Sequence, residues 1–85
     1  MSGIFSSQEK AILKGAKECG EYYSYEVRRN KFYELLSRLG RNPSRHYIKF
    51  AYAIGQNLVL DESDIVDIMC DVWGISSSDI YNAAF

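Results

Sequence analysis

The stretch "DIVDIMCDVWGISSSDIYNAAF", residues 64–85, decides how the C-terminal part of this chain folds. Its first half carries apolar residues every three or four positions, which is the spacing of one face of an α-helix. These apolar residues are Ile65, Ile68, Met69, Val72 and Trp73. Gly74 is suited to ending that helix, and Ser76 or Ser77 is suited to beginning another. The stretch therefore predicts two helices joined by a tight corner, with Trp73 buried.

The rest of the chain gives helical patterns of the same kind. Ser6 followed by Glu9 is a capping box, in which the two residues bond each other's backbone at a helix start. Pro43 is the strongest break in the chain, and Ser44 directly after it is suited to capping the next helix, as Asp61 is for the fourth. The five predicted helices cover residues 7–19, 22–39, 44–57, 61–73 and 77–84.

Each of the first three predicted helices has an apolar face. The faces are Ile12, Ala16, Cys19 and Tyr23; then Tyr22, Tyr25, Phe32, Leu35, Leu36 and Leu39; then Tyr47, Phe50, Ala51, Ile54 and Leu58. We expect the first helix to end near Gly20, because glycine weakens a helix interior by about 1 kcal/mol relative to alanine. Arg38 suits the negative end of the second helix, and Gly40 suits the position just past it.

Length and composition favour a single all-α domain. The chain has 85 residues, of which 47% are hydrophobic and 14% aromatic, which is enough for a packed core. We therefore predict a compact single-domain helical bundle over residues 1–85. No apolar run is long enough to cross a membrane, and no secretory signal is visible. A cytoplasmic location is the resulting expectation, with Cys19 and Cys70 as reduced thiols.

The sequence carries no pattern typical of an enzyme or a metal site. His46 is the only histidine, and Cys19 and Cys70 lack the Cys-x-x-Cys spacing of zinc and redox sites. Residues 53–74 resemble the helices that lead into the calcium loop of EF-hand proteins. A loop beginning at Asp71 would lack side-chain oxygens at its third and fifth positions. We therefore expect no catalytic residue, no cofactor and no bound metal.

The C-terminal corner resembles the helix-turn-helix domains of small bacterial and phage regulators. Cys70 takes the position of the small residue where the helices approach, Gly74 that of the turn glycine and Ile75 that of the apolar residue after it. The resemblance implies a second helix that reads DNA. Its contacts would come from Ser77, Ser78, Tyr81 and Asn82. The corner has no lysine or arginine to neutralise phosphates, so a DNA-binding transcriptional regulator is the alternative hypothesis.

Opposite charges are concentrated in different parts of the chain. Between Arg28 and Lys49 there are seven basic residues opposed by Glu34 alone, whereas the residues from Leu58 onward include six acids and no base. The net charge of the whole chain is only −1. Attraction between the two parts across the fold would explain this pattern, and so would two separate docking surfaces.

Aromatic residues are interleaved with the basic ones. Arginine and tyrosine are enriched at the energetic centres of protein interfaces, and helix starts favour anions. We therefore predict a basic-aromatic face that binds another protein with an acidic surface. Its residues are Arg28, Arg29, Lys31, Tyr33, Arg41, Arg45, His46 and Lys49. Nucleic acid is a second, less favoured partner for the same face.

The first functional hypothesis is a small non-enzymatic protein-interaction module that acts as an adaptor or inhibitor of a larger protein. Proteins of this size without site chemistry are common among accessory and virus-encoded regulators. A third hypothesis is a structural protein that self-associates, for example as a homodimer, when the acidic helix of one copy meets the basic face of another. Such an association would be sensitive to salt.

Overall fold

The computed structural model describes residues 4–40 and 43–85. In these residues the chain forms five α-helices and no strand, which confirms the predicted all-α bundle. The helices are α1 (Ser7–Tyr22), α2 (Tyr25–Arg38), α3 (Arg45–Asn57), α4 (Glu62–Trp73) and α5 (Ser77–Ala84). None of the helices in the described ranges is long and apolar enough to span a bilayer.

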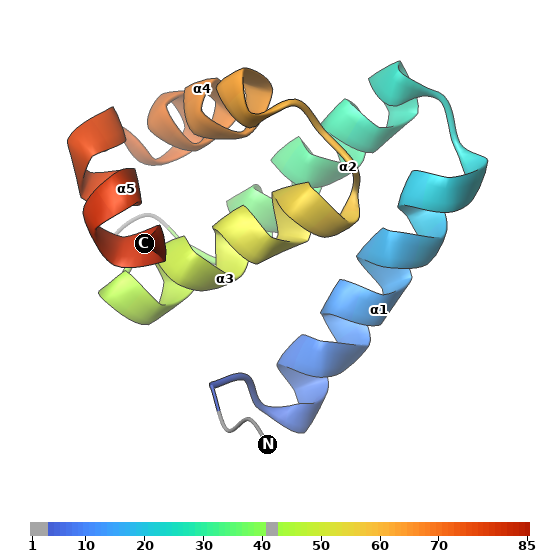
Figure 1. Ribbon diagram of the computed structural model, residues 1–85, viewed down its shortest axis with the longest axis horizontal. Helices are drawn as coiled ribbons and strands as arrows, with labels where there is room; N and C mark the ends of the chain where they lie inside the picture. The colour runs from blue at the N-terminus through green and yellow to red at the C-terminus, as the bar shows by residue number, and fades with distance from the viewer. Residues whose placement is uncertain (1–3, 41–42) are drawn as a thin grey trace.

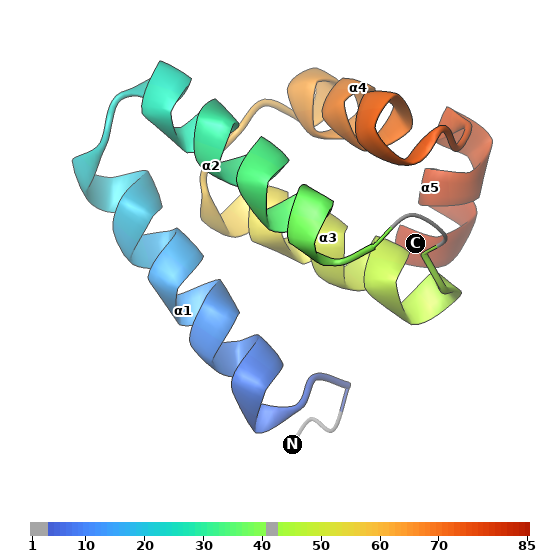
Figure 2. The same cartoon turned by 180° about the vertical axis from the view of Figure 1, so that it is seen from behind.

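The central helix is α3, and the other four helices are arranged around it (Figure 1). The view from behind shows α2 running beside α3, while α1 diverges from α2 (Figure 2). Within the described part of the chain, α1 packs extensively on α3 alone, whereas α4 packs on α2, α3 and α5. Helix α1 therefore packs closely on α3 but on no other helix to a similar extent, whereas α4 packs on three helices.

The core is built almost entirely by α2 to α5. Its largest fully buried side chains are Phe32, Leu36, Phe50, Ile54, Leu58, Ile65, Ile68, Met69 and Ile80. Trp73 is buried as predicted, and no polar or charged residue among the described ones is buried. Ala16 is the buried residue of α1. Because hydrophobic free energy scales with the apolar area removed from water, α2 to α5 supply most of the stability.

Serine residues begin four of the helices. The capping box at the start of α1 is confirmed: the Glu9 N–H donates to Ser6 Oγ at 3.1 Å, and the Ser6 N–H donates to Glu9 Oε1 at 2.9 Å. Ser24, Ser44 and Ser76 accept equivalent backbone bonds at the starts of α2, α3 and α5. Each cap satisfies a backbone N–H that has no partner within its own helix.

The predicted break between the first two helices is present, but it lies at Tyr23 and Ser24 and Gly20 does not end α1. Gly20 lies inside α1, where α1 approaches the end of α3. A Cβ atom on Gly20 would lie 2.6 Å from the main-chain oxygen of Asn57. The glycine is therefore required by close packing of two backbones and not by a helix end.

Several residues predicted on apolar faces are exposed. They are Ile12, Tyr22, Tyr23 and Tyr47. Because α1 has a single packing partner, its buried face is narrow, and the partly buried Leu13 contacts the core in place of Ile12. Asp61 precedes α4 as predicted, but its side chain makes no capping bond. Its N–H instead donates to Tyr25 Oη at 2.9 Å.

The corner between α4 and α5 has the predicted geometry. Gly74 follows α4 with φ at +65°, in the left-handed region, and its N–H donates to the Cys70 oxygen at 2.8 Å. Gly40 likewise has φ at +106° just past α2. Both glycines occupy positions at which a residue with a side chain would be strained.

Candidate functional site

Arg28 ties two loops of the fold together. Its Nη1 donates to the carbonyl oxygens of Leu58 at 3.0 Å and Val59 at 2.8 Å, both just past α3. Its Nε donates to the carbonyl oxygen of Tyr23, between α1 and α2, at 3.1 Å. The guanidinium carbon also lies 5.0 Å from the centre of the Tyr25 ring, within range of a cation–π contact. Arg28, predicted to bind a partner, is thus engaged inside the fold.

The other predicted residues of α2 also have partners within the molecule. Arg29 Nε lies 3.8 Å from Asp64 Oδ2 on α4. Lys31 Nζ lies 3.2 Å from Glu34 Oε1 on the same helix. Tyr33 is half-buried and packs against the core. The basic residues of α2 therefore offer little charge that the fold has not already compensated.

The start of α4 is attached to α2 by a phenol. Tyr25 Oη donates to Asp64 Oδ2 and accepts from the Asp61 N–H. Burial, with a smaller effect of the bond to Asp64, raises the pKa of Tyr25. Asp64 also pairs with Arg29, which is an attraction within the fold between the basic middle and the acidic end of the chain.

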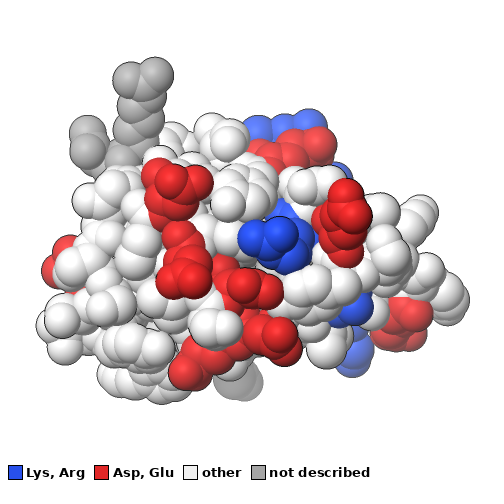
Figure 3. Space-filling view, turned by 90° about the horizontal axis from the view of Figure 1, so that it is seen from above, with Lys and Arg blue, Asp and Glu red and all other residues white. Residues whose placement is uncertain are grey.

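Most acids of α4 do not take part in that attraction. Asp67 and Asp71 are exposed and form no ion pair with any described residue. Figure 3, which looks down on this side of the molecule, shows acidic side chains gathered over a large part of the surface. The attraction between the two parts of the chain is therefore local, and an acidic surface remains in contact with solvent.

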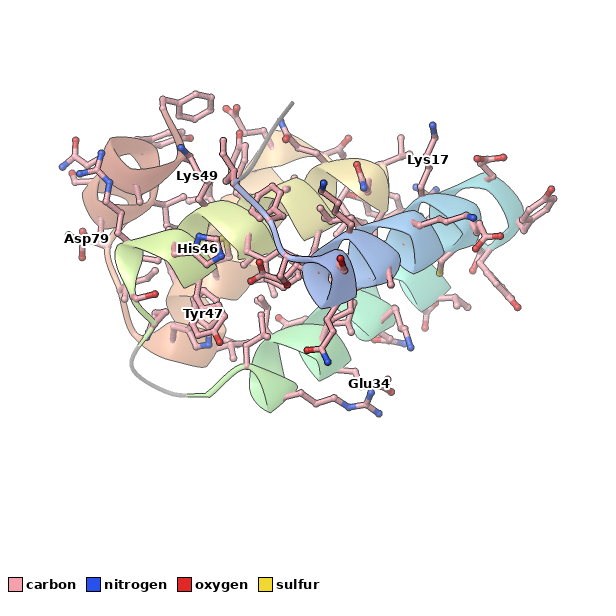
Figure 4. All side chains as sticks on the ribbon, turned by 90° about the horizontal axis from the view of Figure 1, so that it is seen from below. Lys17, Glu34, His46, Tyr47, Lys49 and Asp79 are labelled. Carbon is pink, nitrogen blue, oxygen red and sulfur yellow. The ribbon has the colours of Figure 1, made fainter. Side chains whose placement is uncertain are left out.

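Three of the predicted residues, Arg45, His46 and Lys49, lie in the first turns of α3 and are exposed, as is Tyr47 among them. Figure 4 shows His46, Tyr47 and Lys49 on this stretch of the helix, with Tyr47 and Lys49 on opposite sides of it. Arg45 Nη2 donates to the main-chain oxygen of Asn82 on α5 at 3.0 Å. The predicted Arg41 lies outside the described residues.

His46 connects α3 to the N-terminal cap of α1. Its Nε2 lies 2.9 Å from Glu9 Oε2, and its ring centre lies 5.7 Å from that of Phe5. The backbone bond from Ser6, with a smaller contribution from His46, lowers the pKa of Glu9. The carboxylate that completes the capping box therefore also holds α1 to α3.

An open hollow of about 310 Å³ lies beside the start of α3. Its lining residues are Pro43, Arg45, Ile48, Ile75, Asp79, Asn82 and Ala83. The aliphatic residues provide an apolar floor, and Arg45 and Asp79 provide opposite charges at its border. Asp79 Oδ2 accepts from the Ser76 N–H at 3.3 Å, so this carboxylate belongs to the cap of α5.

The predicted basic-aromatic face is therefore divided between two ends of α3. Arg28 lies at the C-terminal end of α3, where it contacts Leu58 and Val59. Arg45 lies at the first residue of the same helix. A helix of 13 residues is about 20 Å long, so these arginines do not form one contact surface.

The residues implied by the helix-turn-helix resemblance lie on α5. Ser77 and Ser78 are exposed in its first turn, and Asn82 is exposed near its end. Tyr81 Oη lies 3.5 Å from Glu62 Oε2 on α4. The corner thus has the expected shape, but the charges beside its second helix are those of Asp79 and Glu62.

Burial favours the protonated forms of two ionisable side chains near α5, those of Tyr52 and Cys70. Tyr52 Oη donates to Glu62 Oε1 at 2.8 Å, and burial is the main cause that raises the pKa of Tyr52 to about 12. Burial also raises the pKa of the Cys70 thiol, with help from Asp67. A thiol with a raised pKa is a poor nucleophile. In the described ranges, no group of three or more candidate ligands could hold a metal ion.

A surface that the sequence reasoning missed lies where α1, α2 and the α3–α4 loop meet. We call it the corner surface, and it consists of the exposed residues Tyr22, Tyr23, Val27 and Val59. The Tyr23 and Val59 backbones both bond Arg28. One feature of the sequence indicates this surface. The third predicted helix ends at residue 57, and residues 58–60 do not include the glycine that usually follows a helix end.

Comparison of the chain with models of protein families, with curated proteins and with solved structures finds no match.

Proposed function

We propose that this protein is a small non-enzymatic protein-interaction module, an adaptor or inhibitor that docks on the acidic surface of a larger protein. The observation that supports this proposal is the start of α3, where Arg45 and Lys49 are exposed four residues apart, on one side of the helix, and where Arg45 lines an open hollow. Arg28, Arg29 and Lys31 have partners in the fold, so we place the docking surface at this end of α3.

The surface combines the features from which protein interfaces draw their affinity. The hollow would accept an apolar side chain of the partner, and desolvated anchors of that kind carry most of the free energy of binding. Arg45 uses Nη2 to bond Asn82, and its guanidinium has further N–H groups that would pair with a carboxylate. Glu9 and Asp79 lie nearby, but each is engaged in a helix cap, where a negative charge is stabilised.

Selection of a random displayed peptide library on the immobilised protein would test this proposal. We expect peptides rich in aspartate and glutamate that also carry an aromatic or aliphatic anchor. The double variant Arg45→Glu/Lys49→Glu should bind them at least about tenfold more weakly, because it reverses both charges at the surface. Lys14→Glu/Lys17→Glu makes the same charge change on the exposed side of α1 and should bind them normally.

The outcomes of that selection separate the proposal from its competitors. Equal binding of acidic peptides by both double variants would contradict the proposal. Salt-sensitive retention of duplex DNA that is lost in Asn82→Ala would favour the helix-turn-helix alternative. Salt-sensitive sedimentation of the protein as a dimer would favour the self-associating alternative.

A further inference from the structure

The corner surface exposes an unusual amount of apolar side chain. Tyr22 is 79% exposed, Val59 60%, Tyr23 59% and Val27 45%. A groove of about 380 Å³ opens beside them. Its lining residues are Cys19, Tyr23, Val27, Asn30, Lys31 and Glu34. Contiguous exposed apolar side chains on a small domain mark sites where another molecule binds.

Val59 has a backbone conformation that its side chain disfavours. Its φ is +57°, in the left-handed region, and it is the one non-glycine residue of the described chain with a positive φ. Its N–H donates to the Gln56 oxygen at 3.0 Å, and the Leu60 N–H donates to the Gly55 oxygen at 3.1 Å. These bonds form the Schellman motif that ends many helices, and glycine is the usual residue at the position of Val59.

The valine at this position strains the backbone, and burial of its side chain does not offset that strain. A β-branched residue in the left-handed region is a genuine outlier, and such a conformation persists only where the surrounding structure imposes it. Because 60% of Val59 stays exposed, little hydrophobic free energy offsets that strain. The side chain packs on Gly20, whose missing Cβ leaves room for it. Folding alone would therefore be served better by glycine.

Hydrogen bonds and close packing hold the corner surface together before anything binds to it. Arg28 fixes the backbones of Tyr23 and Val59 by hydrogen bonds of 3.1 and 2.8 Å. Gly20 lets the end of α1 sit directly against the residues that follow α3. A surface ordered in advance loses less conformational entropy on binding, which raises affinity.

The unpaired charges next to the corner surface are mainly acidic. Glu18 and Glu21 are exposed beside Tyr22 on α1, and Glu26 is exposed beside Val27 on α2. None of these three glutamates forms an ion pair within the described ranges. Of the nearby bases, Arg28 is bonded to three main-chain oxygens and Lys31 is paired with Glu34, so Lys17 is the exposed base without an ion pair in the described ranges. Charge complementarity therefore favours a ligand that brings positive charge around an apolar centre.

We infer that the corner surface is a second docking site, which binds a segment of a partner protein with apolar side chains flanked by lysine or arginine. The apolar side chains contact Tyr23, Val27 and Val59, and the basic ones meet the neighbouring glutamates. This site lies at the opposite end of α3 from Arg45. Two sites at opposite ends of one helix would let the protein bridge two partners; that bridging role, unlike docking at the corner surface, rests on the proposed function.

The test uses the Arg45→Glu/Lys49→Glu variant as bait for a random displayed peptide library, so that the start of α3 is disabled. We expect enrichment of peptides with aliphatic or aromatic residues next to lysine or arginine. Val59→Gly and Tyr23→Ser, each added to that bait, should weaken binding of the enriched peptides at least about tenfold. Ile12→Ser also removes an exposed apolar side chain from α1, but away from the corner surface, and should leave binding unchanged.

Val59→Gly keeps the test independent of folding, because glycine suits that position and its variant should melt no lower than the bait. Enrichment of peptides without lysine or arginine, unchanged binding by Val59→Gly, or no enrichment at all would overturn the inference. None of these outcomes bears on the acidic peptides selected by the wild-type protein, so the two proposals fail separately. Competition between the two kinds of peptide on the wild-type protein would overturn the bridging role.

Discussion

The guanidinium group of Arg28 donates a hydrogen bond of 2.8 Å to the main-chain oxygen of Val59, 31 residues further along the chain. The same side chain bonds Leu58 and, through Nε, Tyr23. The carbonyl groups that follow α3 have no partners within the helix, so Arg28 supplies partners that water would otherwise provide. A residue that looks like a surface charge in the sequence is therefore a structural link between two loops.

Arg28→Met should destabilise the protein by about 2 kcal/mol, because a charged donor is removed from three carbonyl oxygens. Denaturant titration followed by circular dichroism would measure the loss. Arg38→Met is the matched control. Its partner is the exposed Glu34 on the same helix, and exposed pairs contribute well under about 1 kcal/mol. Equal destabilisation by the two variants would contradict the structural role of Arg28.

Two glycines of α1 should respond to alanine in opposite directions. At Gly20 a Cβ atom would lie 2.6 Å from the Asn57 oxygen, so Gly20→Ala must separate α1 from α3 and lower the midpoint of thermal unfolding. At Gly15 a Cβ atom would meet nothing within 4 Å. Gly15→Ala should therefore raise stability by up to about 1 kcal/mol through helix propensity alone. A midpoint that rises in both variants would mean that α1 does not approach α3 at Gly20.

Val59→Gly should stabilise the protein, which is rare for the removal of an apolar side chain. Relief of the left-handed strain is worth about 1–2 kcal/mol, and the lost contact with Gly20 offsets part of it. In a domain of this size each kcal/mol raises the thermal midpoint by about 4–8 °C. Val59→Ala, which keeps a Cβ atom, should gain much less. A lower midpoint for the glycine variant would show that the valine is needed for folding.

Stability should fall in alkaline solution through Tyr52. Its pKa is about 12 in the folded protein, against 10.0 for an ordinary tyrosine, mainly because of burial. A raised folded pKa means that the folded state keeps a proton which the unfolded state releases. The contribution of Tyr52 to the free energy of unfolding is therefore complete below pH 10 and is lost as the pH rises toward 12. Unfolding titrations from pH 9 to 12 should show a weaker pH dependence for Tyr52→Phe than for the wild type.

The helices and the core of the C-terminal half could be predicted from local patterns. In α4 the spacing of Ile65, Ile68 and Met69 defines the buried face, and Gly74 defines the position where the helix ends. These features are set by neighbours in sequence, so a reading of the chain alone finds them. The capping box of Ser6 and Glu9 is local in the same sense.

The errors arose where distant segments decide the outcome. Gly20 looks like a helix end in sequence, but its role depends on the backbone of Asn57, which lies on another helix. Tyr22 and Tyr23 fit an apolar face, yet they are exposed because α1 packs on α3 alone. Periodicity reveals which residues share a face and does not reveal how much of that face another helix covers.

The candidate site shows the same limit. The clustering of basic residues near α3 is visible in the sequence, but the partners of Arg28 and Arg29 come from loops and helices far along the chain. Among the described residues, Arg45, His46 and Lys49 are neighbours at the start of α3, away from the predicted residues of α2. The corner surface joins residues from three segments, so the local signal at residues 57–60 marks Val59 but not Tyr22, Tyr23 or Val27.

The attachment of α1 has a consequence for the dynamics of the protein. With Ala16 as its buried residue and α3 as its main packing partner, α1 should open as a separate cooperative unit, at a lower free energy than global unfolding. Amide hydrogens of α1 should then exchange with solvent well before those of α3. Val59 packs on Gly20 of α1, so detachment of α1 would disrupt the corner surface. A peptide bound to the corner surface would slow amide hydrogen exchange along the whole of α1. Binding at one end of the helix would therefore be measurable at the other end.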